Sequence, residues 1–341
     1  MIVNRPENLK GVGLVVIGRN EGDRFLACLG SLPIGVPAVY VDSGSSDASV
    51  ANAEAVNVHV AHLSNDVGFT AARARNLGWR TLVKMFPNLE FVQFVDGDCA
   101  LDPGWLSEAL VAINQYDRLA VVFGRRRERH PELSFYNGQC DREWDVPVGE
   151  VLSCGGDALM RVAALAQVEG YNNQLIAGEE PDLCLRMRSL GWRIRRIEPE
   201  MTMHDASILA FGTWWRRAKR AGHAYAEHAF IHGRSSVPNW LRALVSMFVW
   251  AVFFPCVIIF GLVLGFISTG IWFLLPLAVG LIYVLQFLRL SRQTKALGFS
   301  AEVSRAEAFF LLVAKFAHCA GAATFLLNSI IGKRSVLMEY K

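Results

Sequence analysis

The sequence predicts an α/β domain with a mostly parallel, doubly wound sheet, followed by a helical membrane region. In the first two thirds, short β-branched and aromatic runs alternate with helical patterns, as in sheets covered by helices. In the last third, long apolar runs carry no charged residue, as in membrane-spanning helices. We therefore expect a cytoplasmic domain at residues 1–240 and a membrane region at residues 241–341.

The first part of the domain is expected to alternate strands and helices. The expected strands are 13–18, 38–41, 56–60 and 90–95, and the expected helices are 21–32 and 70–85, with another starting near Asp47. The first turn lacks the pattern G-x-G-x-x-G, which argues against a dinucleotide dehydrogenase. It offers instead Arg19, Asn20 and Glu21, polar side chains suited to a base or a ribose.

Two carboxylates, Asp96 and Asp98, follow the strand at 90–95 with Gly97 between them. Open α/β sheets bind ligands at the carboxyl ends of their strands. Because Gly97 permits a tight turn, both acids can converge on one hard cation or on a cluster of sugar hydroxyls. A plain turn rich in Asp and Gly explains the triplet alone equally well, so the assignment depends on further motifs.

The apolar excess lies at 243–266 and 271–288, and hydrophobic residues make up 52% of the chain. A spanning helix needs about 20 apolar residues, so the two runs predict a membrane hairpin. A soluble core hairpin is the alternative, but apolar runs this long are seldom soluble. Basic residues flank both ends of the hairpin, among them Arg234 and Arg289, which places both ends and the domain in the cytoplasm.

A third apolar stretch, at 308–331, contains Lys315 and His318 and precedes a basic tail. A full crossing would export this tail against the positive-inside rule, so we expect an interfacial or re-entrant helix. No secretory signal is expected at the start, because the apolar stretch at 12–17 is short and leads into Arg19.

Six motifs follow one another between residues 10 and 225. They are V-I-G-R-N-E-G (16–22), V-D-S-G-S-S-D (41–47), G-F-T-A-A-R-A-R-N-L-G (68–78), V-D-G-D (95–98), G-G-D (155–157) and G-E-E-P-D-L-C-L-R (178–186). In this order and spacing the chain resembles family 2 glycosyltransferases with the GT-A fold, and the succession is more specific than any single motif. The tail at 332–341 is similar to that of membrane-anchored members associated with bacterial exopolysaccharide assembly.

The resemblance implies a nucleotide-sugar donor, UDP- or GDP-linked, and Mg²⁺ or Mn²⁺. Asp42 ends a strand and can accept a hydrogen bond from a base, although turn chemistry also explains it. The family often has a second Asp where this chain has Ser43, so the base is not assigned. Arg75 matches an arginine beside the donor. The donor-binding set is therefore Arg19, Asn20, Glu21, Asp42, Arg75, Asp96 and Gly97.

The metal set that the resemblance implies is Asp98, His204 and Asp96. Asp98 would be the direct ligand, with Asp96 holding sugar or ribose hydroxyls and a metal-bound water. His204 follows a strand expected at 192–197, where the family often supplies a third ligand. A lone histidine is more often structural, so both readings stay open.

Glu179 and Glu180 open an expected helix after Gly178. Adjacent like charges push one carboxyl pKa upward, which suits a general base, whereas an ordinary acidic first turn explains one of the two acids. The family pattern is usually Glu-Asp, and Glu180 falls on the Asp that deprotonates the acceptor hydroxyl. Glu is one methylene longer than Asp, so Glu179 stays the alternative.

Two segments are expected to bind the acceptor. Gly155, Gly156 and Asp157 offer close backbone approach and a carboxylate, and a plain turn is the alternative. Trp215, Arg216 and Arg217 loosely resemble the Q-x-x-R-W segment of processive members, without its glutamine or order. An interfacial amphipathic helix, with Trp among lipid headgroups and Arg toward phosphates, explains this segment equally well.

These assignments predict an inverting, metal-dependent hexosyltransferase in the bacterial inner membrane, with its catalytic domain facing the cytoplasm. The acceptor would be a saccharide on a polyprenyl diphosphate, in surface or exopolysaccharide synthesis. The expected partners are the donor, this acceptor and membrane lipids, without nucleic acid. One alternative is a processive synthase that conducts its product across the membrane. Two spans make it improbable that the chain builds such a channel by itself. Another is a silent membrane scaffold, which the presence of every catalytic acid disfavours.

Overall fold

The computed structural model describes residues 9–233 and 240–332. Arg234 and the tail at 333–341, used above for orientation and family resemblance, lie outside the described residues. The chain divides into two compact units, Met1–Ile208 and Leu209–Lys341. This division precedes helix α8 (Phe211–His232), whereas the hydrophobicity of the sequence suggested a boundary near residue 240.

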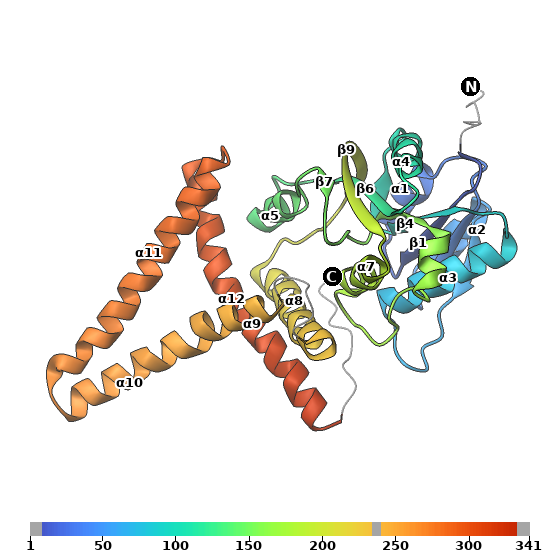
Figure 1. Cartoon of the computed structure of the whole chain (residues 1–341). Helices are drawn as coiled ribbons and strands as arrows, with labels where there is room; N and C mark the ends of the chain where they lie inside the picture. Colours follow the sequence, from blue (N-terminus) through green and yellow to red (C-terminus); the bar gives the residue numbers. More distant parts are fainter. Residues whose placement is uncertain (1–8, 234–239, 333–341) are drawn as a thin grey trace. The chain divides into compact units, whose positions relative to one another are not determined.

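The first unit is built on a nine-stranded sheet in the order β3-β2-β1-β4-β8-β6-β9-β5, with β7 on β9 (Figure 1). The strands are β1 Val12–Gly18, β2 Ala38–Asp42, β3 His59–His62, β4 Phe91–Asp96, β5 Cys99–Leu101, β6 Leu119–Glu128, β7 Gly149–Glu150, β8 Ala158–Arg161 and β9 Arg193–His204. The helices are α1 Asp23–Ser31, α2 Ser49–Ala55, α3 Ala71–Met85, α4 Trp105–Asn114, α5 Phe135–Glu143, α6 Val162–Gln167 and α7 Glu179–Ser189. The predicted α/β fold is confirmed, with parallel pairing among β3, β2, β1 and β4 and mixed pairing beyond.

The central strand β1 explains where the site forms. Its residues from Val12 to Ile17 are buried, as expected for a strand covered on both faces. Gly18 pairs with Asp42 of β2, and Ile17 pairs with Asp96 of β4. The polar residues that follow these three parallel strands therefore gather at one edge of the sheet.

Two strand boundaries differ from the expectation. The strand expected at 56–60 begins only at His59, because Val56 is the C-cap of α2 and Asn57 takes a left-handed conformation with φ 60°. The strand expected at 192–197 continues to His204, because β9 pairs with β6 and with β5 along its second half.

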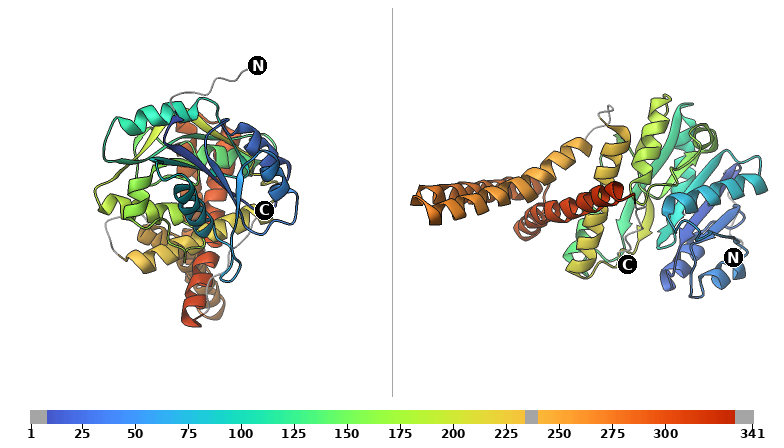
Figure 2. Two further views of the ribbon diagram at one scale, coloured as in Figure 1. Left: turned by 90° about the vertical axis from the view of Figure 1, so that its right-hand side faces the viewer. Right: turned by 90° about the horizontal axis from the view of Figure 1, so that it is seen from below.

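The second unit is helical. Its elements are α8, α9 Trp240–Phe248, η2 Val249–Phe253, α10 Phe254–Ile267, η3 Gly270–Phe273, α11 Leu274–Ala296 and α12 Ala301–Ile330. Among the described residues, three segments are long and apolar enough to cross a membrane: Trp240–Ile267, Gly270–Ala296 and Ala301–Ile330. The first two contain the predicted spans, and α10 and α11 form the two arms of a hairpin (Figure 1, Figure 2).

Helix α12 is continuous and crosses α8 (Figure 1). The two backbones touch at a pair of glycines. A Cβ on Gly222 would lie 2.0 Å from the carbonyl oxygen of His318, and a Cβ on Gly321 would lie 1.9 Å from that of Lys219. The third apolar stretch therefore packs tightly against a helix that carries several basic side chains.

Candidate active site

The loops after β1 and β2 are joined by hydrogen bonds. Asn20 has φ 55°, and its Oδ1 accepts from the backbone N–H of Ser46 at 2.7 Å. The backbone N–H of Asn20 donates to Ser45 Oγ at 3.1 Å. The guanidinium of Arg19 lies over the ring of Phe69, 5.3 Å from its centroid. The first predicted donor-binding residues are therefore held on the sheet edge.

Asp42 organises the second loop. Its carboxylate is 4% exposed and accepts from the backbone N–H groups of Gly44 and Ser45, each at 3.1 Å, and from Tyr40 Oη at 3.2 Å. Glu21 pairs with Arg24 at 2.9 Å. The structure thus brings Asp42 and residues 19–21 to the same edge, and their contacts with a base or ribose stay predictions.

A buried arginine connects three carboxylates at this edge. Arg75, on α3, is 3% exposed, and its Nη2 donates to Asp96 Oδ1 at 2.8 Å. Its Nη1 lies 2.9 Å from Glu179 Oε1 and 3.0 Å from Glu180 Oε1. Burial acts to lower the pKa of Arg75, but the carboxylates, Asp96 foremost, outweigh it and hold that pKa well above its ordinary value. Arg75 therefore stays charged and ties the end of β4 to the start of α7.

The G-G-D motif, which directly precedes β8, supports this arrangement. A Cβ on Gly156 would lie 2.5 Å from Arg75 Nη2 and 2.8 Å from Asp96 Oδ2, whereas Gly155 faces open space. Asp157 Oδ1 accepts from the backbone N–H of Asp96 at 2.8 Å, and its Oδ2 accepts from Thr202 Oγ1 at 2.8 Å. Asp157 is thus engaged within the protein, and an acceptor contact for it stays a prediction.

The two glutamates of α7 differ in environment. Glu179 accepts from Arg75 and its side chain is 6% exposed, whereas that of Glu180 is 15% exposed. Burial, with the neighbouring charge of Glu179, raises the pKa of Glu180 to about 7, although Arg75 acts to lower it. Glu180 is therefore the more accessible of the two and can accept a proton near neutral pH.

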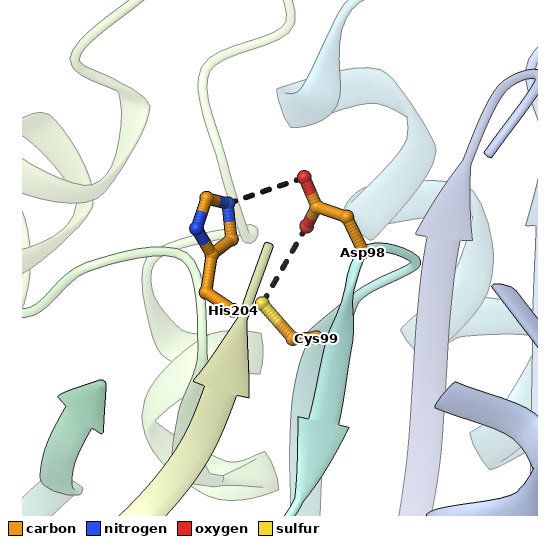
Figure 3. Close-up of side chains that lie close together, drawn as sticks. All are labelled: Asp98, Cys99 and His204. Carbon is orange, nitrogen blue, oxygen red and sulfur yellow. Dashed lines mark hydrogen bonds and ion pairs between the residues drawn. The ribbon is translucent and has the colours of Figure 1, made fainter. Parts of the chain in front are cut away.

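A second cluster forms on the other side of Gly97, whose N–H donates to the carbonyl of Ile17 at 2.8 Å. Asp98, Cys99 and His204 lie together because Cys99 of β5 pairs with His204 of β9 (Figure 3). Asp98 Oδ2 lies 3.2 Å from His204 Nε2, and the Cys99 thiol lies 3.5 Å from Asp98 Oδ1. One ligand atom from each lies within 4.8 Å of the others, which is close enough to hold a metal ion.

The chemistry of this cluster suits a divalent cation. Burial, assisted by Arg126, lowers the pKa of His204, so its imidazole is neutral and can act as a ligand. A carboxylate oxygen with an imidazole nitrogen is a donor set that Mn²⁺ accepts. Burial raises the pKa of the Cys99 thiol well above its ordinary value, so the thiol stays protonated.

Asp96 belongs to a second group of close ligand atoms, which shares Cys99 with that cluster. Its Oδ2 is 3.3 Å from Nη1 of Arg126, and the same nitrogen is 3.4 Å from Asp157 Oδ2. A group of Asp96, Cys99 and Asp157 also has close ligand atoms, but arginines already face both acids. The structure thus brings Asp98 and His204 together and turns Asp96 toward Arg75 and Arg126.

Sequence reasoning missed the polar end of β6. Arg126 faces Asp96, its guanidinium stacks on Trp144 at 4.8 Å, and Glu128 contacts His204. The run R-R-R-E at 125–128, which directly follows the apolar residues 119–123 and Gly124, was the available signal in the sequence.

The predicted acceptor residues Trp215, Arg216 and Arg217 lie near the start of α8, in the second unit. Trp215 packs against Phe211, with ring centroids 5.8 Å apart. Their contact with an acceptor stays a prediction.

Comparisons with known proteins agree with this fold. Residues 17–151 match the family model Glycosyl transferase family 2. The mannosyltransferase PcManGT from Pyrobaculum calidifontis, solved with GDP-Man and Mn²⁺, aligns with a TM-score of 0.56 at 13% identity, over 93% of this chain and 87% of that one. No curated protein sequence matches the chain significantly.

Two further solved structures align with lower scores. TarS 1–349 from S. aureus has a TM-score of 0.47 at 15% identity, over 94% of this chain and 92% of that one. Glucosyl-3-phosphoglycerate synthase from Mycobacterium tuberculosis has a TM-score of 0.44 at 16% identity, over 67% of this chain and 81% of that one. The fold assignment rests on the family match and on the mannosyltransferase. Residues 17–151 are therefore similar to glycosyl transferase family 2, and the first unit has the GT-A fold.

Proposed function

We propose that this protein transfers a hexose from a UDP- or GDP-linked donor to an acceptor hydroxyl, with inversion at the anomeric carbon. The observation that carries the proposal is the Arg75 junction. It joins Asp96, which ends a central strand as donor-binding acids do, to Glu180, a candidate base on α7. A donor and an acceptor held by these two carboxylates would meet beside one buried guanidinium.

Asp98 and His204 would hold Mg²⁺ or Mn²⁺, which their buried oxygen and nitrogen ligands fit. When bound, such an ion stabilises negative charge on the departing nucleoside diphosphate. The similar mannosyltransferase was solved with GDP-Man and Mn²⁺, which agrees with this assignment. Asp42 and Asn20 would receive the nucleoside, and Asp96 would accept hydrogen bonds from sugar hydroxyls.

Glu180 would take the proton of the attacking hydroxyl. Its pKa of about 7 makes it a stronger base than an ordinary carboxylate while it is still substantially ionised at neutral pH. Arg75 orients Glu180 and favours its charged form, and Glu179 accepts a hydrogen bond from the same guanidinium nitrogen, Nη1. Direct displacement by the activated hydroxyl would invert the anomeric centre.

A lipid-linked acceptor is supported by the second unit. Helix α8 carries Arg216, Arg217, Lys219 and Arg220, and a basic side chain costs about 2.5–3.5 kcal/mol at the centre of a membrane helix. Because α12 packs on α8 by direct backbone contact, we place both helices at the cytoplasmic interface and only the hairpin across the membrane. Arg216 and Arg217 would then face a polyprenyl diphosphate.

Cysteine labelling tests this topology. Cysteine introduced at Ser300, between α11 and α12, should resist impermeant reagents added outside intact cells and react after permeabilisation. Cysteine at Thr269, in the turn of the hairpin, is the matched control and should label from outside. Outside labelling at position 300 would contradict the two-span arrangement.

The transfer itself is tested with the full chain in detergent, a panel of UDP- and GDP-sugars and a polyprenyl diphosphate saccharide. We expect nucleotide release and a glycosylated lipid whose anomeric configuration, read by NMR, is opposite to that of the donor. Asp98→Ala should lose both, whereas the exposed Asp117→Asn should behave as the parent. Release of no nucleotide from any donor, or a product with retained configuration, would overturn the proposal.

A further inference from the structure

We propose that Glu128 is a positioning residue that fixes the His204 ring with its Nε2 directed at the metal site, an inference that rests on the proposed function. The inference comes from a contact on the side of the His204 ring that faces away from Asp98. Glu128 Oε2 lies 3.2 Å from His204 Nδ1, while Asp98 Oδ2 lies 3.2 Å from Nε2. The imidazole thus bridges two carboxylates.

The register of the strands places Glu128, His204 and Asp98 beside one another. Glu128, the last residue of β6, pairs with His204, the last residue of β9. On the opposite side of β9, His204 pairs with Cys99, next to Asp98. His204 therefore lies between Asp98, a candidate metal ligand next to β5, and Glu128, the proposed orienting group at the end of β6.

The surroundings of Glu128 make it a hydrogen-bond acceptor. Its side chain has no exposed surface, its Oε2 accepts from the backbone N–H of Ala206 at 3.0 Å, and its Oε1 accepts from that of His130 at 3.3 Å. A carboxylate surrounded by N–H donors favours a proton on the adjacent Nδ1 of His204. The lone pair of the ring is then on Nε2, facing Asp98.

Packing keeps the ring in this orientation. Trp144 contacts the His204 ring edge-on, with centroids 4.8 Å apart and planes at 84°. Asn137 is buried under the same region and donates to Glu128 Oε1 at 3.4 Å. Carboxylates placed behind metal-bound histidines in this way typically account for about 10–100-fold in metal affinity.

The test measures Mn²⁺ binding by the full chain in detergent, using the electron paramagnetic resonance of free Mn²⁺. Glu128→Gln keeps the size of the side chain, but its amide can donate to Nδ1 and so moves the ring proton to Nε2. We expect Mn²⁺ affinity to fall about 10–100-fold. Glu132→Gln, at a 68% exposed side chain in the same loop region, should bind as the parent.

A second readout needs no stable Glu128 variant. In metal-free parent protein labelled with ¹⁵N-histidine, the resonances that disappear in His204→Gln should report a proton on Nδ1 at pH 8. A proton on Nε2, or parental Mn²⁺ affinity in folded Glu128→Gln, would overturn the inference and leave the proposed transfer intact. A parent that binds no Mn²⁺ would instead overturn the metal site of the proposed function, and the role of Glu128 with it.

Discussion

Asp96 and Asp98 are two residues apart, yet their carboxylates have different partners. Asp96 faces the guanidinium groups of Arg75 and Arg126, so charges of the chain itself neutralise it. Asp98 faces the imidazole of His204. The turn at Gly97, between β4 and β5, separates the two environments. The comparison teaches that two acids of one motif can have different protein partners, because the neighbouring strands decide which side chains each one contacts.

The largest expected effect concerns Glu180, the proposed base, which shares the partner Arg75 with Asp96. Glu180→Gln keeps the size of the side chain but cannot accept the proton, and loss of a general base typically costs about 10²–10⁴-fold in rate. Binding of the nucleotide sugar should survive, since Glu180 is assigned to the acceptor. Turnover and donor titration on one preparation measure both quantities.

Glu179→Gln is the matched variant for this experiment. It retains the proposed base and should keep more activity than Glu180→Gln. A nearly active Glu180→Gln beside an inactive Glu179→Gln would assign the base to Glu179 instead.

The pH dependence should follow the same carboxyl group. Glu180 must be deprotonated to act, and its pKa is about 7, so the rate should rise through neutral pH. At pH 6 about a tenth of the base is ionised, which predicts a rate about tenfold below the alkaline plateau. In Glu179→Gln the neighbouring charge is gone, so the midpoint of the profile should move to lower pH. A midpoint that does not move would contradict the electrostatic coupling of the pair.

A smaller effect is expected at the glycine that packs on the Arg75–Asp96 pair. The methyl group of Gly156→Ala would overlap Arg75 Nη2 and Asp96 Oδ2. Overpacking of this kind costs about 1–3 kcal/mol and should lower the thermal unfolding midpoint of the full chain. Gly155→Ala enters open space and is the control. Equal unfolding midpoints for the two variants would contradict this prediction and show that Arg75 and Asp96 can shift without loss of stability.

Local patterns predicted much of this molecule. Apolar strand patterns located β1, β2 and β4, and the absence of charge located the apolar helical hairpin, whose helices are long enough to cross a membrane. The pairing of Asp98 with His204 required the family resemblance, because β5 and β9 are distant in the chain.

What the sequence did not predict depends on contacts across the fold. Glu128 and Arg126 reach the site only because β6 lies beside β9, a pairing that no local pattern encodes. The same holds for Gly222 and Gly321. Their role, to let the backbones of α8 and α12 touch, is visible only where the two helices cross.

The division between the two acids is tested most directly by Mn²⁺ affinity in Asp96→Asn and Asp98→Asn, measured side by side on the full chain. Both substitutions remove one charge and keep the side-chain shape. We expect Asp98→Asn to lose Mn²⁺ binding and Asp96→Asn to retain it within a few-fold, while sugar transfer falls in both. Equal loss of Mn²⁺ in the two variants would contradict the account and return both acids to one metal site.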